Sequence, residues 1–171
     1  MSQPSFPAPV CAVDVHYRET GACAAAVTFN AWSDPAPEME VTAEIQKVAD
    51  YEPGRFYVRE LPCILTVLGK LPRPPRIVVV DGYVWLREGE PGLGFHLYEA
   101  LHRAVPVIGV AKTAFDGSAH AVPVMRGGST RPLYVTAADI DPDVAAAHIT
   151  SMHGPHRLPV LLKAVDLLCR S

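Results

Sequence analysis

Apolar and polar residues alternate with two different periods along this chain, and the first third favours strands. Residues 11–17 form an apolar, β-rich run, and the small residues around Gly21 lead to a second run at residues 25–29, so we expect a hairpin. Residues 41–49 supply a third strand candidate. Three antiparallel strands are therefore predicted to open the fold.

The middle of the chain switches between helical and strand periods. Residues 61–71 place apolar side chains at helical spacing, and residues 92–104 also favour a helix. Residues 77–80 are an uninterrupted β-branched run, which suits a parallel strand covered on both faces, and residues 105–110 favour another buried strand. The last candidates are one strand and two helices, at residues 133–136, 143–152 and 160–169. The predicted fold class is α/β, with a mixed sheet that is antiparallel at first, parallel later, and covered by helices on both faces.

Length and composition set the scale of the molecule. With 171 residues, 49% of them hydrophobic, the chain is long enough for one core, so we expect a single domain over residues 1–171. Residues 1–9 are expected to be a flexible N-terminus and lack the basic start and apolar block of a secretory signal. No stretch approaches the roughly 18 to 20 apolar residues of a membrane span. A cytoplasmic protein without a membrane partner is predicted.

Charge and cysteine usage narrow the function classes. The net charge of −3 argues against an extensive basic coat for nucleic acid, although Lys70, Arg73, Arg76 and Arg87 lie within a short stretch. The four cysteines lack the short spacing of zinc or redox motifs. We expect them to be buried, reduced thiols.

Three acidic residues occupy positions that suggest chemistry. Asp14 lies inside an apolar strand, where a buried charge needs a compensating partner such as a divalent cation. Glu60 stands at the predicted start of a helix, and Asp81 ends a predicted strand. A favourable charge at a helix N-terminus would also explain Glu60, and an ordinary turn would explain Asp81. Their spacing alone leaves their convergence open.

Lys112 follows a second predicted buried strand, at the same sheet edge as Asp81. The carboxyl ends of parallel strands are where open α/β sheets gather their chemistry, and a lysine there could meet a phosphate as a point charge. A solvated lysine at a strand end is the competing explanation.

Several short blocks, taken in their order along the chain, resemble the endonuclease V family. The resemblance covers the chain from about residue 11 to its C-terminus, and no single block is specific. The blocks are Val13-Asp14-Val15-His16-Tyr17, Tyr51-Glu52-Pro53-Gly54, Val58-Arg59-Glu60-Leu61-Pro62, Val79-Val80-Asp81-Gly82, Gly92-Leu93 with His96-Leu97, and Ile108-Gly109-Val110-Ala111-Lys112. The chain lacks the helix that usually precedes the first strand, so it is identified as a divergent, N-terminally shortened member.

The resemblance implies a ribonuclease H-like fold and a metal-dependent nuclease. Asp14, Glu60 and Asp81 take the metal-binding positions, for Mg²⁺ with Mn²⁺ as a substitute, and Lys112 takes the position near the scissile phosphate. The segment from His156 to Pro159 is similar to the start of a family motif whose register puts Asp166 near the metal. The implied reaction cuts DNA or RNA one nucleotide 3′ of an inosine and leaves a 3′-hydroxyl.

The same resemblance implies which residues bind nucleic acid. Tyr51 falls on the tyrosine of a strand-separating wedge, where an aromatic ring can stack on a base. The family pocket for the flipped base corresponds to Gly54, Gly82 and Gly109, because backbone without a Cβ can approach a base closely. Turn geometry alone would also explain these glycines.

Several substrate-contacting positions depart from the family pattern. Val84 replaces a pocket glycine and predicts altered lesion selectivity, and Arg87 replaces a histidine. Acidic residues flank Tyr51, where like charge opposes nucleic acid. An alternative function is therefore a catalytically impaired or retargeted relative that binds nucleic acid or a protein.

Overall fold

The computed structural model describes residues 7–116 and 120–171, so residues 1–6 of the predicted flexible terminus lie outside it. The strands are β1 (Val10–Tyr17), β2 (Ala22–Phe29), β3 (Met39–Ile45), β4 (Ile77–Asp81), β5 (Trp85–Arg87), β6 (Glu90–Pro91), β7 (Val107–Ala111), β8 (Val122–Val124) and β9 (Leu133–Ala138). The helices are α1 (Phe56–Leu68), α2 (Leu93–Ala100), α3 (Pro142–Ser151) and α4 (Val160–Arg170). The predicted order of the longer strands and of the four helices is confirmed.

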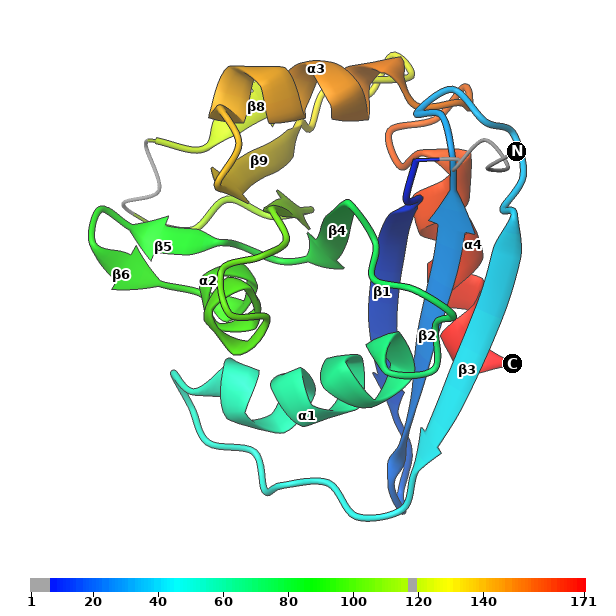
Figure 1. The fold of residues 1–171 in the computed structure, drawn as a ribbon. Helices are drawn as coiled ribbons and strands as arrows, with labels where there is room; N and C mark the ends of the chain where they lie inside the picture. Colours follow the sequence, from blue (N-terminus) through cyan, green and yellow to red (C-terminus); the bar gives the residue numbers. More distant parts are fainter. Residues whose placement is uncertain (1–6, 117–119) are drawn as a thin grey trace.

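One sheet organises the molecule, with the strand order β3-β2-β1-β4-β7-β9-β8 (Figure 1). The first three strands are antiparallel neighbours, and β4 and β7 then add in parallel to β1. The next strand, β9, is antiparallel to β7, and β8 is antiparallel to β9. A parallel pair needs a crossover of about a dozen residues, usually helical, and no helix lies between β7 and β9 in the described residues. The parallel part is therefore limited to β1, β4 and β7.

Helices cover both faces of the sheet, as predicted (Figure 1). On one face, α1 and α2 bury Cys63, Ile64 and Leu97 against the odd-numbered residues of β1. On the other, α3 and α4 bury Ile149 and Leu161 against the even-numbered residues. No helix among the described residues combines the length and apolar character that crossing a membrane requires. The four cysteines are free and buried, as expected.

Two helices differ from their predicted limits, and the first difference changes the position of a candidate residue. Helix α1 begins at Phe56 rather than at residue 61, so Glu60 lies inside the helix and not at its start. The sequence favours a start close to Pro62 because proline suits a first helical turn, yet here Pro62 is in the interior. Helix α2 ends before residue 104 because His102 and Arg103 adopt φ values of 58° and 56°.

Three short strands were not predicted. Strands β5 and β6 form a separate two-stranded sheet, and β8 has three residues at the edge of the main sheet. Runs of two or three residues are too short to show a period of two. Among the longer strands, β1, β4 and β7 run parallel, so their carboxyl ends meet at one edge of the sheet.

Candidate metal and nucleic-acid site

Asp14 lies near the carboxyl end of β1 and is partly buried. It continues the even-numbered face on which Val10 and Ala12 pack against the α4 side of the core. Burial, followed by the nearby charge of Asp81, raises its pKa to about 7, although one carboxylate oxygen accepts a hydrogen bond of 2.9 Å from the Val15 N–H. The strand therefore holds an acid at a position that opposes its ionisation.

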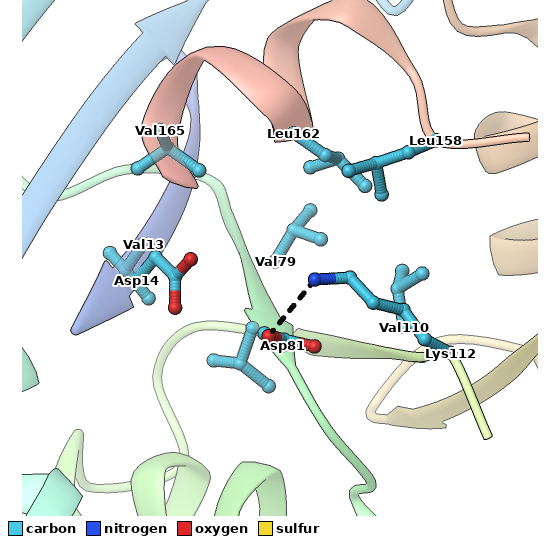
Figure 2. Close-up of a pocket in the computed structure, with 10 residues that line it drawn as sticks. Val13, Asp14, Val79, Asp81, Val110, Lys112, Leu158, Leu162 and Val165 are labelled. Carbon is cyan, nitrogen blue, oxygen red and sulfur yellow. Dashed lines mark ion pairs between the residues drawn. The ribbon is translucent and has the colours of Figure 1, made fainter. Parts of the chain in front are cut away.

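Asp81 is the last residue of β4 and faces Lys112, which directly follows β7. Their charged atoms are 3.6 Å apart, and the two side chains are 43% and 42% exposed (Figure 2). An ion pair as exposed to solvent as this one contributes at most about 1 kcal/mol to stability. Its importance lies in placing a cation beside the carboxylates.

Glu60 reaches the same region from α1 and is only 5% exposed. Its Oε2 atom has no hydrogen-bond partner among the residues that the structure describes. Burial, with the charges of Asp14 and Asp81, raises the pKa of Glu60 to about 8. A buried carboxylate oxygen without a partner is costly, so this position requires either a proton or a cation.

Asp166 projects from α4 into the same space. It accepts hydrogen bonds of 2.9 Å from Arg170 Nε and 3.4 Å from Lys163 Nζ. Burial alone would raise its pKa, but these cations outweigh burial and hold the pKa of Asp166 below its ordinary value. The ligand atoms of Asp14, Asp166 and Cys169 lie within 4.8 Å of one another. Asp166 is thus an ionised acid beside two acids whose ionisation is opposed.

These side chains line one cleft of about 480 Å³, which we call the carboxylate cleft. It contains every predicted catalytic position, together with further residues from β1, α1 and α4. The lining residues are Asp14, Val15, His16, Tyr17, Phe56, Glu60, Asp81, Lys112, Asp166 and Arg170. Carboxylates from four separate elements offer the oxygen ligands that a hard divalent cation prefers, and the unpartnered oxygen of Glu60 fits such an ion.

An apolar layer supports the cleft between the sheet and α4. Figure 2 shows Leu158, Leu162 and Val165 on one side of a small pocket, with Asp14, Asp81 and Lys112 on the other. The pocket has a volume of only about 20 Å³. Apolar packing next to the acids lowers the local dielectric and strengthens electrostatic effects within the cleft.

A second space, of about 260 Å³, adjoins the cleft and shares Phe56 and Asp81 with it. We call it the apolar pocket, because its walls are mainly hydrophobic side chains and glycine backbone. The lining residues are Gly54, Phe56, Tyr57, Asp81, Gly82, Tyr83, Leu86, Pro91, Gly92, Leu93 and Phe115. Gly54 and Gly82 have φ values of 78° and 133°, a backbone that other residues rarely adopt. Two of the three predicted pocket glycines, Gly54 and Gly82, therefore line this space, and their contact with a base stays a prediction.

Val84 and Gly109, also assigned to nucleic-acid binding from the sequence, line neither space. Val84 is fully buried, and a Cβ added to Gly94 would lie 2.6 Å from Val84 Cγ2. A Cβ added to Gly109 would lie 2.6 Å from the carbonyl oxygen of Gly82. Both residues shape the turn behind the pocket, so the valine adds core packing and does not fill the pocket as we expected.

Tyr51 and Arg87 lie outside both spaces. Tyr51 is 60% exposed in the segment before α1. Arg87 pairs with Glu90 at 3.1 Å, donates to the Asp116 carbonyl oxygen at 3.0 Å, and lies 5.0 Å from the centre of the Phe115 ring. The structure thus leaves Tyr51 accessible, whereas Arg87 braces the loop that carries one wall of the apolar pocket.

Several residues of the site were not predicted. Arg170 could have been found, because it stands four residues after Asp166, where a helix places side chains on one face. Phe56 and Phe115 belong to segments without a pattern, so nothing in the sequence pointed to them. Arg59, whose guanidinium lies 3.7 Å from the centre of the Tyr17 ring, was quoted in a motif without a role.

Comparison with known proteins gives a consistent family. The family model described as Endonuclease V matches residues 2–141. Endonuclease V of Streptomyces avermitilis is 31% identical over an alignment that covers 94% of this chain and 79% of that protein. The corresponding protein of Streptomyces coelicolor is 33% identical, over 95% of this chain and 78% of that protein.

Solved structures show the same similarity. The crystal structure of the Streptomyces avermitilis protein superposes with a TM-score of 0.74 at 28% identity, covering 98% of this chain and 82% of that one. Endonuclease V of Ciona intestinalis, solved with a 23mer DNA containing an inosine followed by a ribo-adenosine, has a TM-score of 0.77. At 16% identity over 95% of this chain and 83% of that one, the second likeness shows the fold alone. With the Streptomyces avermitilis structure, it supports a ribonuclease H-like fold.

Proposed function

This chain belongs to the endonuclease V family, and we therefore propose that it is a metal-dependent endonuclease that cuts DNA or RNA 3′ to inosine or another deaminated base. The observation that carries the proposal is the buried Glu60 carboxylate, whose Oε2 atom lacks a partner within the described chain. This atom lies in a cleft with three further carboxylates. Such an arrangement is costly unless a cation completes it.

We assign the divalent ion, Mg²⁺ or Mn²⁺, to Asp14, Glu60 and Asp81, with Asp166 assisting. When bound, the ion would lower the pKa of a coordinated water and neutralise charge on the phosphate. Asp14 and Glu60 have pKa values raised to about 7 and about 8 by burial and by neighbouring acids, so they favour a cation at neutral pH. Both ions are named because the oxygen-rich ligands suit either of them.

Lys112 is assigned to the phosphate. Its ammonium group, 3.6 Å from Asp81, is on the open side of the cleft, where it can offset negative charge as the phosphorus is attacked. We place the cut one nucleotide 3′ of the inosine, leaving a 3′-hydroxyl.

The apolar pocket is assigned to the flipped base. Its volume of about 260 Å³ and its glycine backbone suit a planar base, and it adjoins the cleft through Asp81 and Phe56. Tyr51, exposed beside this region, is assigned to stacking on the strand, and Gly54 and Gly82 to close backbone contact with the base. Nucleic acid is thus the proposed partner, and we retain a single domain and a cytoplasmic location as parts of the proposal.

The proposal is tested by incubating the protein with inosine-containing single- and double-stranded DNA and RNA in Mg²⁺ or Mn²⁺. The expected result is a nick that depends on the inosine and is lost in Asp81→Ala. Adenine-containing oligonucleotides of the same sequence are the control. Absence of cutting on all four substrates, or equal cutting by Asp81→Ala, would show that the cleft is not a nuclease centre.

A second function, binding without cleavage, is favoured by one observation. Asp50 and Glu52 flank the exposed Tyr51, and their negative charge opposes a nucleic-acid strand at that position. Retention of labelled inosine-containing DNA without any metal-dependent nick would support this alternative and reject the nuclease.

A further inference from the structure

The segment at residues 112–115 connects the two spaces of the site. It follows β7 as irregular backbone, and it carries Lys112 into the carboxylate cleft and Phe115 into the apolar pocket. Without helical or strand hydrogen bonds, its shape depends on side chains from elsewhere. The position of the Lys112 ammonium group is therefore set by whatever fixes this backbone.

Two distant side chains hold the segment at its ends. Arg157 Nη1 donates hydrogen bonds to the carbonyl oxygens of Lys112, at 3.1 Å, and of Pro132, at 3.5 Å. The Tyr83 hydroxyl donates to the Thr113 carbonyl oxygen at 2.6 Å and accepts from the Phe115 N–H at 3.1 Å. Arg157 thus fixes the end that carries the lysine, and Tyr83 fixes the end that carries the aromatic wall.

Arg157 is itself held in place by a buried arginine. Arg126 is 8% exposed, and its guanidinium donates to four carbonyl oxygens in the loop between α3 and α4. These acceptors are Met152 at 2.6 Å, Gly154 at 3.2 Å, His156 at 2.9 Å and Arg157 at 3.1 Å. One side chain therefore determines the course of the loop.

The loop packs closely enough to have a single shape. Gly127 has φ of 62°, and a Cβ at this position would lie 2.5 Å from the carbonyl oxygen of Pro155. Arg126 pairs with no carboxylate in the part of the chain that the structure describes, so its burial is offset by the four carbonyl groups. A change in the loop shape would leave the buried guanidinium of Arg126 without hydrogen-bond acceptors. This energetic cost keeps Arg157 in position.

We propose that Arg157 is a positioning residue for Lys112, and that Arg126 fixes Arg157 through the loop backbone. The inference rests on the proposed function, in which Lys112 meets the phosphate. The Lys112 side chain is 42% exposed, and within the described residues its ion pair is with Asp81 alone, so its direction depends on its backbone. Release of the Lys112 carbonyl by Arg157 would let the ammonium group move away from the reacting phosphate.

The test is a double-mutant cycle of Arg157→Ala and Lys112→Ala, with kcat and KM measured on an inosine-containing oligonucleotide. We expect Arg157→Ala to lower kcat by roughly tenfold to a hundredfold, the scale of a small misplacement of a catalytic group, with little change in KM. In the Lys112→Ala background, Arg157→Ala should cost nothing further, because the group that it positions is gone. Arg157→Lys, which keeps one donor, should give an intermediate kcat.

Controls separate this inference from the proposed function and from misfolding. Arg103→Ala removes an equal charge from an exposed pair with Glu99 at the other end of the sheet, and should leave kcat unchanged. If Lys112→Ala itself retains full kcat, the proposed role of the lysine is wrong. If Lys112→Ala is slow but the effects of the two changes simply add, or Arg157→Ala is as fast as wild type, the positioning role is overturned. Should Arg157→Ala fail to fold, Arg157→Lys takes its place in the same cycle.

Discussion

Two buried charged side chains in this molecule, Arg126 and Glu60, differ in whether the fold supplies their hydrogen-bond partners. The Arg126 guanidinium donates hydrogen bonds to four carbonyl groups of one loop. The Glu60 carboxylate, at a similar depth, has an oxygen with no partner in the described residues and lies near Asp14 and Asp81, which share its charge. One site is complete as folded, and the other becomes complete only when a proton or a cation is added.

The difference separates stability from function. A satisfied buried charge fixes structure, and its removal should cost folding energy. An unsatisfied cluster of acids lowers stability, and proteins retain such clusters mainly at functional sites. Substitution at each site should therefore have effects of opposite kind.

The largest effect is expected for Glu60→Gln, which keeps the shape of the side chain but removes its charge. Cleavage should fall by roughly a thousandfold or more, as for loss of a group that organises the charge at a reacting centre. At pH 8 and without metal, the same change should raise the free energy of unfolding by a few kcal/mol, because it removes the cost of burying the charge and its repulsion by Asp14 and Asp81. Cleavage assays and urea unfolding measure the two effects. Glu99→Gln, in an exposed ion pair, is the matched control, and a variant that keeps its activity would remove Glu60 from the site.

At the other buried charge, Arg126→Met should lower the free energy of unfolding by about 3 kcal/mol, because four carbonyl groups lose their donor. Urea unfolding followed by circular dichroism gives this value. Arg131→Met, an exposed arginine nearby, should change stability by no more than about 0.5 kcal/mol. A loss below about 1 kcal/mol for Arg126→Met would show that water replaces the guanidinium and that the two charges are less different than the structure indicates.

The acids also predict how stability depends on pH. Their pKa values in the folded, metal-free protein, about 7 for Asp14 and about 8 for Glu60, exceed the ordinary values of 3.8 and 4.5. The folded state therefore binds more protons than the unfolded state between these limits, so stability should fall as pH rises from about 4 to about 8. The expected loss is at least about 3 kcal/mol, and Mg²⁺ should reverse it at pH 8. Stability that stays level or rises across this window, in the absence of metal, would contradict the raised pKa values.

The smallest effect concerns the pocket. Because the Val84 side chain lies in the core behind the apolar pocket, Val84→Ala should cost about 1.5 kcal/mol of stability through lost burial. The ratio of kcat/KM for inosine and adenosine substrates should remain that of the wild type. A clear change in this ratio, measured on paired oligonucleotides, would mean that Val84 contacts the base after all.

The fold was predictable because its elements follow simple rules. Buried parallel strands are indicated by the four β-branched residues of β4 and by the apolar run of β7, and α4 has a clear apolar face. The antiparallel direction of β9 was missed, since it depends on the absence of a crossover helix and not on the residues of the strand. The early start of α1 was missed because Pro62 fits a helix start better than a helix interior.

The site was predictable only in part, because a sequence gives the identity of groups and not their distances. Asp14 stood out as a charge in an apolar strand, whereas Glu60 and Asp81 gained weight only from the family resemblance. The buried position of Glu60, and the packing of Val84 against Gly94, are products of tertiary structure. Arg126 gave no signal, since an arginine whose partners are backbone carbonyls has no motif.

The central claim is most directly tested by crystals of the protein grown with Mn²⁺, in which anomalous scattering identifies the ion without reference to activity. The account predicts a peak coordinated by carboxylate oxygens of Asp14, Glu60 and Asp81, and its loss in crystals of Glu60→Gln. A peak elsewhere with this cleft empty, or an unchanged peak in Glu60→Gln, would contradict it.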